Sequence, residues 1–152
     1  MLRLLESGGR AFECNGAKVA AVITSAGVLH AKFQGVLTAR IAETLRAAIA
    51  GRLGTDVLAV MANYTDAALE LTPEEQRAMM AGDGKYQLPE LPAVVVSVGR
   101  IAEQLRDHAT HAAMSRGRRR VVVSSAHEAA AWADARATEA RVNRQIGALV
   151  FR

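Results

Sequence analysis

The alternation of apolar and polar residues predicts a β-hairpin early in the chain. Two strand-like runs, Lys18–Thr24 and Val28–Gln34, flank the turn sequence Ser25-Ala26-Gly27. In the second run the apolar Leu29, Ala31 and Phe33 occupy every other position. Because successive side chains of a strand point to opposite faces, we expect one face of the hairpin to pack inward and the other to meet water or a partner.

Helical and strand-like patterns alternate after the hairpin. The spacing of apolar residues predicts helices over about 38–52, 100–115 and 125–145. The capping box Thr72-Pro73-Glu74-Glu75 predicts a shorter helix that ends near Ala81. Short apolar runs predict buried strands at Val57–Ala62, Ala93–Val98 and Arg120–Ser124. We expect a loop over Asn63–Asp66, and a last strand or a packed tail over Ile146–Phe151.

The predicted order of elements, β-β-α-β-α-β-α-β-α, indicates an α/β fold. It favours a mixed, mostly parallel sheet with right-handed crossovers, about four helices and an antiparallel hairpin at the N-terminal edge. The chain has 152 residues, of which 51% are hydrophobic and 22% charged, and no linker-like segment divides it. We therefore expect residues 1–152 to form a single domain around one core.

Two short motifs give this order of elements a family resemblance. Gly35-Val36-Leu37-Thr38 leads into the first helix, and Glu128-Ala129-Ala130-Ala131-Trp132 lies in the last one. The first motif is similar to a G-x-L-T entry to the first helix. The second is similar to an E-A-x-x-W pattern, with one extra residue before the tryptophan. Over roughly residues 17–140 the chain thus resembles the SpoIIAA-like fold of STAS domains, the anti-anti-sigma factor group, and in particular bacterial SpoIIAA-like proteins of the STAS and CRAL-TRIO kind.

The resemblance implies a regulatory or binding role, and it implies that the segment Tyr64–Thr72 corresponds to the regulatory segment of STAS domains. In STAS domains a serine of an Asp-Ser-Ser-Gly-type motif, at a helix N-terminus, is phosphorylated by a partner kinase, and this switches partner binding. The corresponding segment here, Tyr64–Thr72, lacks that motif. Its candidate regulatory or interaction residues are Thr65, Asp66 and Thr72.

Thr72 has two alternative roles. A phosphate on its hydroxyl would meet free backbone N–H groups and the favourable end of the helix dipole. However, Pro73 removes one N–H donor, and Glu74 and Glu75 would repel the phosphate. We therefore expect Thr72 to be an ordinary N-cap rather than a phosphorylation site, in a module without the usual phosphoserine motif.

The basic residues are concentrated in the C-terminal third. The formal net charge is +4, with −1 over residues 1–99 and +5 over residues 100–152. The densest cluster, a candidate patch for an anionic partner, consists of Arg116, Arg118, Arg119 and Arg120. Aromatic residues do not interleave with these arginines as they do in proteins that stack nucleic-acid bases. We therefore do not expect nucleic-acid binding, and we favour a basic helix end followed by a solubilising loop.

The sequence contains no recognisable catalytic constellation. It has no Gly-rich phosphate loop after a strand and no Gly-x-Ser-x-Gly elbow. The single cysteine, Cys14, excludes an intramolecular disulfide and a multi-cysteine metal site. His108 and His111 share a helix face, but we interpret them as surface or partly buried histidines rather than metal ligands. We expect no enzyme activity, no cofactor and no metal.

These observations favour a non-enzymatic regulatory or protein-interaction module that binds a protein partner or another copy of itself. The alternative hypothesis is a domain for a small apolar ligand or a lipid, held by the expected loops Asn63–Leu71 and Gly82–Pro92. The lone cysteine, and the absence of a signal-like start or of a run of about 18 apolar residues, favour a cytoplasmic protein without a transmembrane segment.

Overall fold

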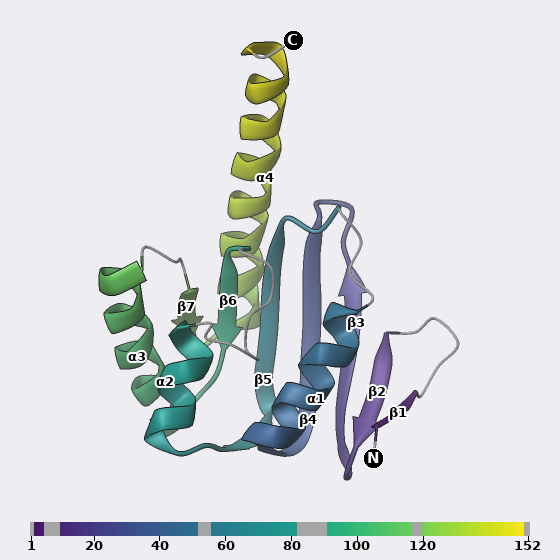
Figure 1. Cartoon of the computed structure of the whole chain (residues 1–152), viewed down its shortest axis with the longest axis vertical. Helices are drawn as coiled ribbons and strands as arrows, with labels where there is room; N and C mark the ends of the chain where they lie inside the picture. The colour runs from purple at the N-terminus through teal and green to yellow at the C-terminus, as the bar shows by residue number, and fades with distance from the viewer. Residues whose placement is uncertain (1, 5–9, 52–55, 82–90, 117–119, 151–152) are drawn as a thin grey trace.

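A seven-stranded sheet with helices on both faces forms the body of the molecule (Figure 1). The structure is a computed structural model that describes residues 2–4, 10–51, 56–81, 91–116 and 120–150. The strands are β1 (Leu2–Leu4), β2 (Ala11–Cys14), β3 (Ala17–Ile23), β4 (Val28–Thr38), β5 (Ala59–Glu70), β6 (Ala93–Val96) and β7 (Arg120–Val123). The helices are α1 (Ala39–Ala50), α2 (Pro73–Ala81), α3 (Arg100–Arg116) and α4 (Ala126–Val150).

The strands lie side by side in the order of the sequence, from β1 to β7. The pairs from β1 to β4 are antiparallel, and those from β4 to β7 are parallel. This arrangement confirms the predicted α/β fold, with the hairpin β3–β4 ahead of alternating helices and strands. The strands β1 and β2 were not predicted, so the antiparallel part of the sheet is larger than expected.

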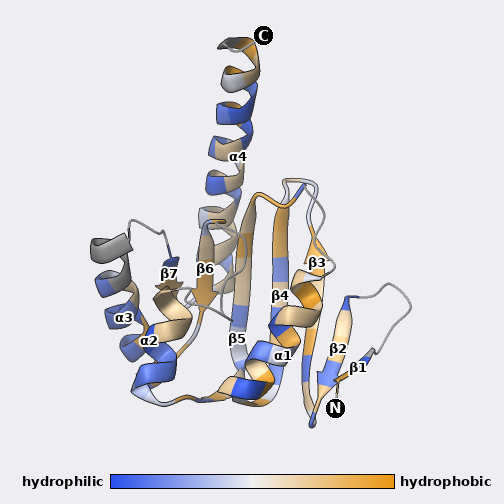
Figure 2. Ribbon diagram, in the orientation of Figure 1, coloured by the Kyte–Doolittle hydropathy of each residue, from blue (hydrophilic) through white to orange (hydrophobic). Residues whose placement is uncertain are grey.

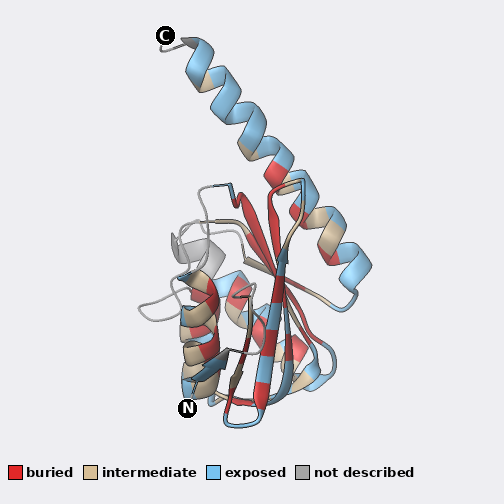
Figure 3. Ribbon diagram, turned by 90° about the vertical axis from the view of Figure 1, so that its right-hand side faces the viewer, coloured by how far each residue is buried: buried red, intermediate tan, exposed pale blue. Residues whose placement is uncertain are grey.

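The helices divide into two layers around the sheet. α1, α2 and α3 lie on one face, and α4 lies alone on the other (Figures 1 and 3). On the first face the predicted inward side chains of β4, Leu29, Ala31 and Phe33, are all buried. On the second face Ala129, Ala133 and Ala137 of α4 pack against a cluster that includes Val94 of β6. Figure 2 shows the hydrophobic colour concentrated on the strands between these layers.

The predicted helix starts are confirmed by side-chain caps. The hydroxyl of Thr38 accepts a hydrogen bond of 3.3 Å from the backbone N–H of Ile41. At α2 the capping box is complete, because Glu75 N–H donates to the Thr72 hydroxyl at 3.1 Å and Thr72 N–H donates to the Glu75 carboxylate at 2.8 Å. These bonds satisfy backbone donors that the first turn of a helix leaves without intrahelical partners.

The expected loop at Asn63–Asp66 is wrong, because β5 continues as a strand to Glu70. The polar residues that suggested a loop alternate with inward residues such as Tyr64, which is buried. A shift of register against β4 occurs here, since Lys32 pairs with Asn63 but Gln34 pairs with Asp66. The extra residue on β5 marks a β-bulge, which turns the following side chains without ending the strand.

The expected strand or tail at Ile146–Phe151 is also wrong for the described residues, since α4 continues as a helix to Val150. Only the first part of this helix lies on the sheet, through Ala129, Ala133 and Ala137. Beyond them α4 projects past the edge of the sheet, as Figures 1 and 3 show. We call residues 142–150 the α4 overhang.

Candidate functional site

The candidate regulatory residues do not form one cluster. Thr65 and Asp66 lie within β5, whereas Thr72 caps α2, beyond the end of that strand. Beyond Asp66 the four residues 67–70 continue β5 over roughly 13 Å of strand before Thr72 is reached. The Thr65 hydroxyl donates to the side-chain oxygen of Asn63 at 2.7 Å, and the Asp66 carboxylate forms a 2.9 Å salt bridge with Lys32. The salt bridge joins β4 to β5, whereas the Thr65–Asn63 bond lies within β5.

Thr72 is exposed and serves as the N-cap of α2. Its hydroxyl oxygen is already an acceptor for the N–H of Glu75, whose carboxylate returns to the N–H of Thr72. A phosphate on this oxygen would displace both bonds and would lie beside that carboxylate. The N-cap prediction is confirmed, and the segment has the geometry of a helix start.

The predicted arginine patch lies largely outside what the structure describes. Arg118 and Arg119 are outside the described residues, and of Arg116 only the backbone is described. The side chain of Arg120, at the start of β7, turns toward α2, where its Nη1 donates to the carbonyl oxygen of Met79 at 3.2 Å. Arg120 therefore helps to join α2 to the edge of the sheet.

A small apolar cavity lies between α1 and the sheet. Its volume is about 30 Å³, which is room for one or two waters rather than for a lipid. Leu29, Phe33 and Ile49 are among the residues that line it, together with the two arginines Arg46 and Arg120.

The wall of this cavity is held by an aromatic stack. The ring of Phe33 stacks on that of Tyr64 with centroids 4.6 Å apart, and the Arg46 guanidinium donates to the Tyr64 hydroxyl, at 3.0 Å from Nε.

The structure bears on the two loops that were expected to hold a small ligand. The first, Asn63–Leu71, in fact consists of the second half of β5 and the residue after it. Of the second, residues 82–90 lie outside the described residues.

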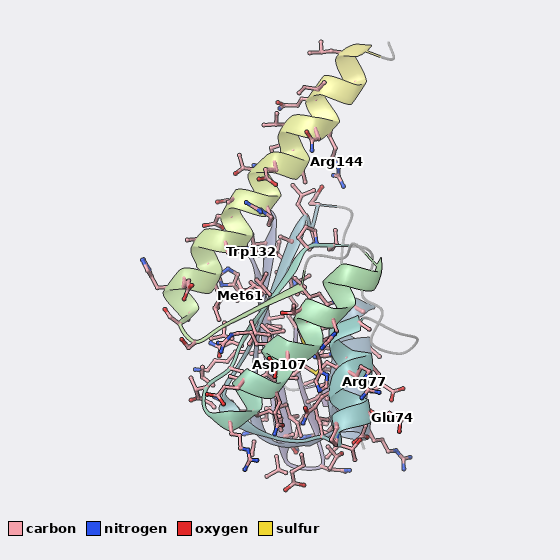
Figure 4. All side chains as sticks on the ribbon, turned by 90° about the vertical axis from the view of Figure 1, so that its left-hand side faces the viewer. Met61, Glu74, Arg77, Asp107, Trp132 and Arg144 are labelled. Atoms are coloured by element: carbon pink, nitrogen blue, oxygen red, sulfur yellow. The ribbon has the colours of Figure 1, made fainter. Side chains whose placement is uncertain are left out.

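Methionines and the two histidines of α3 are further side chains that could line a ligand or metal site. Met61 is buried under α4, whereas Met79 and Met80 of α2 are buried near the opposite face of the sheet, so these three line no common groove. In Figure 4 Met61 and Trp132 lie in the layer between α4 and the sheet. His108 is half-buried and His111 is exposed on α3. Among the described residues no group of three or more histidine, cysteine or acidic side chains is placed to hold a metal ion.

A polar cleft opens where α4 leaves the sheet. It has a volume of about 410 Å³, and its charged lining residues are Asp56, Arg141 and Arg144. Arg141 spans it, with Nη2 donating to the carbonyl oxygen of Ala26 at 2.9 Å. The hairpin turn between β3 and β4 thereby supports α4 near the last point at which the helix lies beside the body.

The α4 overhang exposes large apolar side chains. Val142, Ile146 and Leu149 have 44%, 53% and 74% of their surface accessible, and their i, i+4, i+7 spacing places them on one face of the helix. At 100° per residue this face is opposite to Ala129, Ala133 and Ala137, so it points away from the chain's own sheet. The sequence interpretation missed this surface, although the spacing of the three residues was a signal for it.

The described helices include none that is long and apolar enough to cross a membrane. This finding includes α4, despite its 25 residues.

Comparison with known proteins gives a structural likeness but no family. No protein-family model and no curated protein matches the chain. Among solved structures, an uncharacterised protein of the DUF3478 family from Shewanella loihica aligns over 80% of this chain and 96% of its own, with a TM-score of 0.49 and 13% identity. That protein is described as having a SpoIIAA-like fold, the fold that the sequence predicts. Its function is not established, so the likeness concerns the fold alone.

Proposed function

We propose that this chain is a non-enzymatic protein-interaction module that holds a protein partner through the α4 overhang. The observation that carries the proposal is the row of Val142, Ile146 and Leu149, exposed on the face of α4 that turns away from the body. Apolar anchors at i, i+4 and i+7 are the pattern with which an amphipathic helix enters an apolar groove or pairs with another helix.

The stability of the overhang supports this proposal. Most of the stability of a helix in a protein comes from packing of an apolar face rather than from helix propensity, so a helix end without such packing frays readily. The overhang continues α4 for nine residues, without a sheet beneath it. Burying its apolar side chains would contribute about 25 cal/mol per Å² removed from water. A partner is therefore the natural source of the missing stabilisation.

Thr65, Asp66 and Thr72 do not carry the proposed binding. Each of these candidate residues has a structural contact of its own, in the β4–β5 pair or at the start of α2. The free, buried thiol of Cys14 supports a reducing compartment such as the cytoplasm.

Site-specific photo-cross-linking in the native cell tests the proposal. Ile146 is replaced by a photoactivatable phenylalanine analogue, and a matched variant carries the same analogue at Val22, which is exposed to 63% on β3. We expect a protein adduct from position 146 but not from position 22. The adduct should disappear when Val142→Ser and Leu149→Ser are added, because these changes remove the apolar anchors on either side.

The identity of the cross-linked chain, read by mass spectrometry, then specifies the partner. If position 146 gives no protein adduct while the variant is folded and normally abundant, the proposed function is wrong.

A further inference from the structure

We infer that the partner of the α4 overhang is a second copy of this chain, whose α4 packs antiparallel against the first. This inference rests on the proposed function and makes it more specific. It follows from the whole outer face of α4, which the sheet leaves uncovered along the full length of the helix.

The outer face of α4 has small residues in its first half and large ones in its second. At 100° per residue Ala131 and Ala135, both exposed, lie on the same face as Val142, Ile146 and Leu149. An antiparallel pair centred near residue 140 aligns Ala135 with Ile146 of the other copy, and Ala131 with Leu149. Ile146 and Leu149 then each meet an alanine, and Val142 lies near the centre of the pair opposite Thr138, so the two helices can approach closely at both ends of their overlap. A parallel pair would instead place large against large at one end and small against small at the other.

The charges of α4 favour the same direction. Residues 126–139 contain three acidic side chains and one arginine, Arg136, for a net charge of −2. Residues 140–150 contain Arg141 and Arg144 and no acidic side chain, for a net charge of +2. Packed helices have axes about 8–10 Å apart, which is close to the Debye length of about 8 Å at physiological ionic strength. Arg141 and Arg144 line the polar cleft between α4 and the body, so these charges do not lie in the contact and act on the partner only across the helix. The antiparallel direction is therefore favoured mainly by the fit of large against small side chains, with smaller contributions from the net charges of the two halves and from the helix dipoles.

The resulting contact is symmetric, because the same face serves both copies. From residue 131 to residue 149 it extends along about 27 Å of helix. A single helix pair is at the small end of specific interfaces, which bury roughly 1,200–2,000 Å². We therefore expect a dimer that dissociates on dilution.

Disulfide trapping tests both the partner and its direction. Two variants of the full chain are made, Ala135→Cys and Ile146→Cys, and are oxidised mildly, alone and as an equimolar mixture. The antiparallel pair predicts a covalent dimer in the mixture only, formed from one copy of each variant. In either variant alone the two introduced thiols are eleven residues apart along the pair, about 16 Å, and a disulfide needs Cα atoms within about 7 Å.

Controls separate the possible results. The unmodified chain should form no covalent dimer, because its only thiol, Cys14, is buried. A mixture of Val22→Cys with Ile146→Cys tests for random collision, since Val22 is exposed on the sheet. Sedimentation of the unmodified chain should show a monomer–dimer equilibrium that Ile146→Ser shifts to monomer by tenfold or more in Kd.

Cross-linking of a single variant with itself would overturn the antiparallel arrangement. A chain that sediments as a monomer at every concentration would overturn the dimer. If in that case the photoactivatable group at position 146 still traps a different protein, the proposed function holds and only the self-association fails.

Discussion

Arg141 and Ala26, which are 115 residues apart in the sequence, are joined by a hydrogen bond from the guanidinium Nη2 to the backbone carbonyl oxygen at 2.9 Å. The bond ties α4 to the turn between β3 and β4. It lies at the polar cleft, one residue before the α4 overhang, and so holds α4 to the body at the point from which the helix projects.

Arg141→Met should therefore loosen the end of α4 without unfolding the body. The side chain is exposed, so the loss in the free energy of unfolding should stay below about 1.5 kcal/mol. Amide hydrogen exchange over residues 142–150 and in the turn should become several-fold faster. Arg144→Met is the matched control, because Arg144 lines the same cleft one turn further along. Equal exchange rates in Arg141→Met and in the unmodified chain would show that the bond does not hold the helix.

The capping box at α2 predicts a cost for Thr72→Ala. This change removes the acceptor for Glu75 N–H, and N-cap replacements by alanine cost about 1 kcal/mol. Thr72→Ser should recover most of the loss. Thr110→Ala, at an exposed position in α3, is the control, since alanine there raises helix propensity and should not destabilise. Urea unfolding of the four proteins measures these differences, and a neutral Thr72→Ala would show that the box contributes nothing.

Two glycines with positive φ offer a second matched pair. Gly27 has φ of +88° and Gly99 of +77°, so alanine is strained at both. A Cβ at Gly27 would also be 2.9 Å from the backbone oxygen of Asp56, whereas at Gly99 it would meet nothing within 4 Å. We expect Gly99→Ala to cost about 1–2 kcal/mol and Gly27→Ala about 2–4 kcal/mol. Thermal melts compare the two, and equal costs would mean that the turn moves freely away from Asp56.

Much of the sheet and of the helix starts could be predicted from local patterns. A short local pattern predicts the buried side of β4, with Leu29, Ala31 and Phe33. Another predicts the capping box at Thr72. The length of β5 could not be read in this way. Asn63 and Asp66 have the composition of a turn, and only the pairing with β4 keeps the chain extended there.

The sequence did not predict the exposed apolar face of the α4 overhang, for a related reason. The alanines of α4 indicate close packing on a sheet, but they do not show where that sheet ends. Val142, Ile146 and Leu149 fit a buried strand or an apolar tail as well as an exposed helix face, until the sheet is seen to stop before them. The extent of a tertiary contact is a property of the whole fold and is not contained in a local pattern.

His108 provides a prediction for the pH dependence of stability. Partial burial on α3 lowers the pKa of His108 below its ordinary value of 6.5, and the positive charge of Arg77 on α2 lowers this pKa further. The negative charge of Asp107 raises the pKa, and His111 lowers it slightly. Figure 4 labels Arg77 and Asp107. The unfolded chain thus takes up this proton at a higher pH than the folded one. The free energy of unfolding should therefore be unaffected by His108 well above pH 6.5 and should fall as the pH drops below it.

In His108→Gln the loss of stability between pH 7 and pH 5, measured by urea unfolding, should be smaller than in the unmodified chain. Arg77→Gln, which keeps the histidine but removes the nearby charge, should give an intermediate result. An unchanged loss in His108→Gln would show that other groups govern the acid sensitivity.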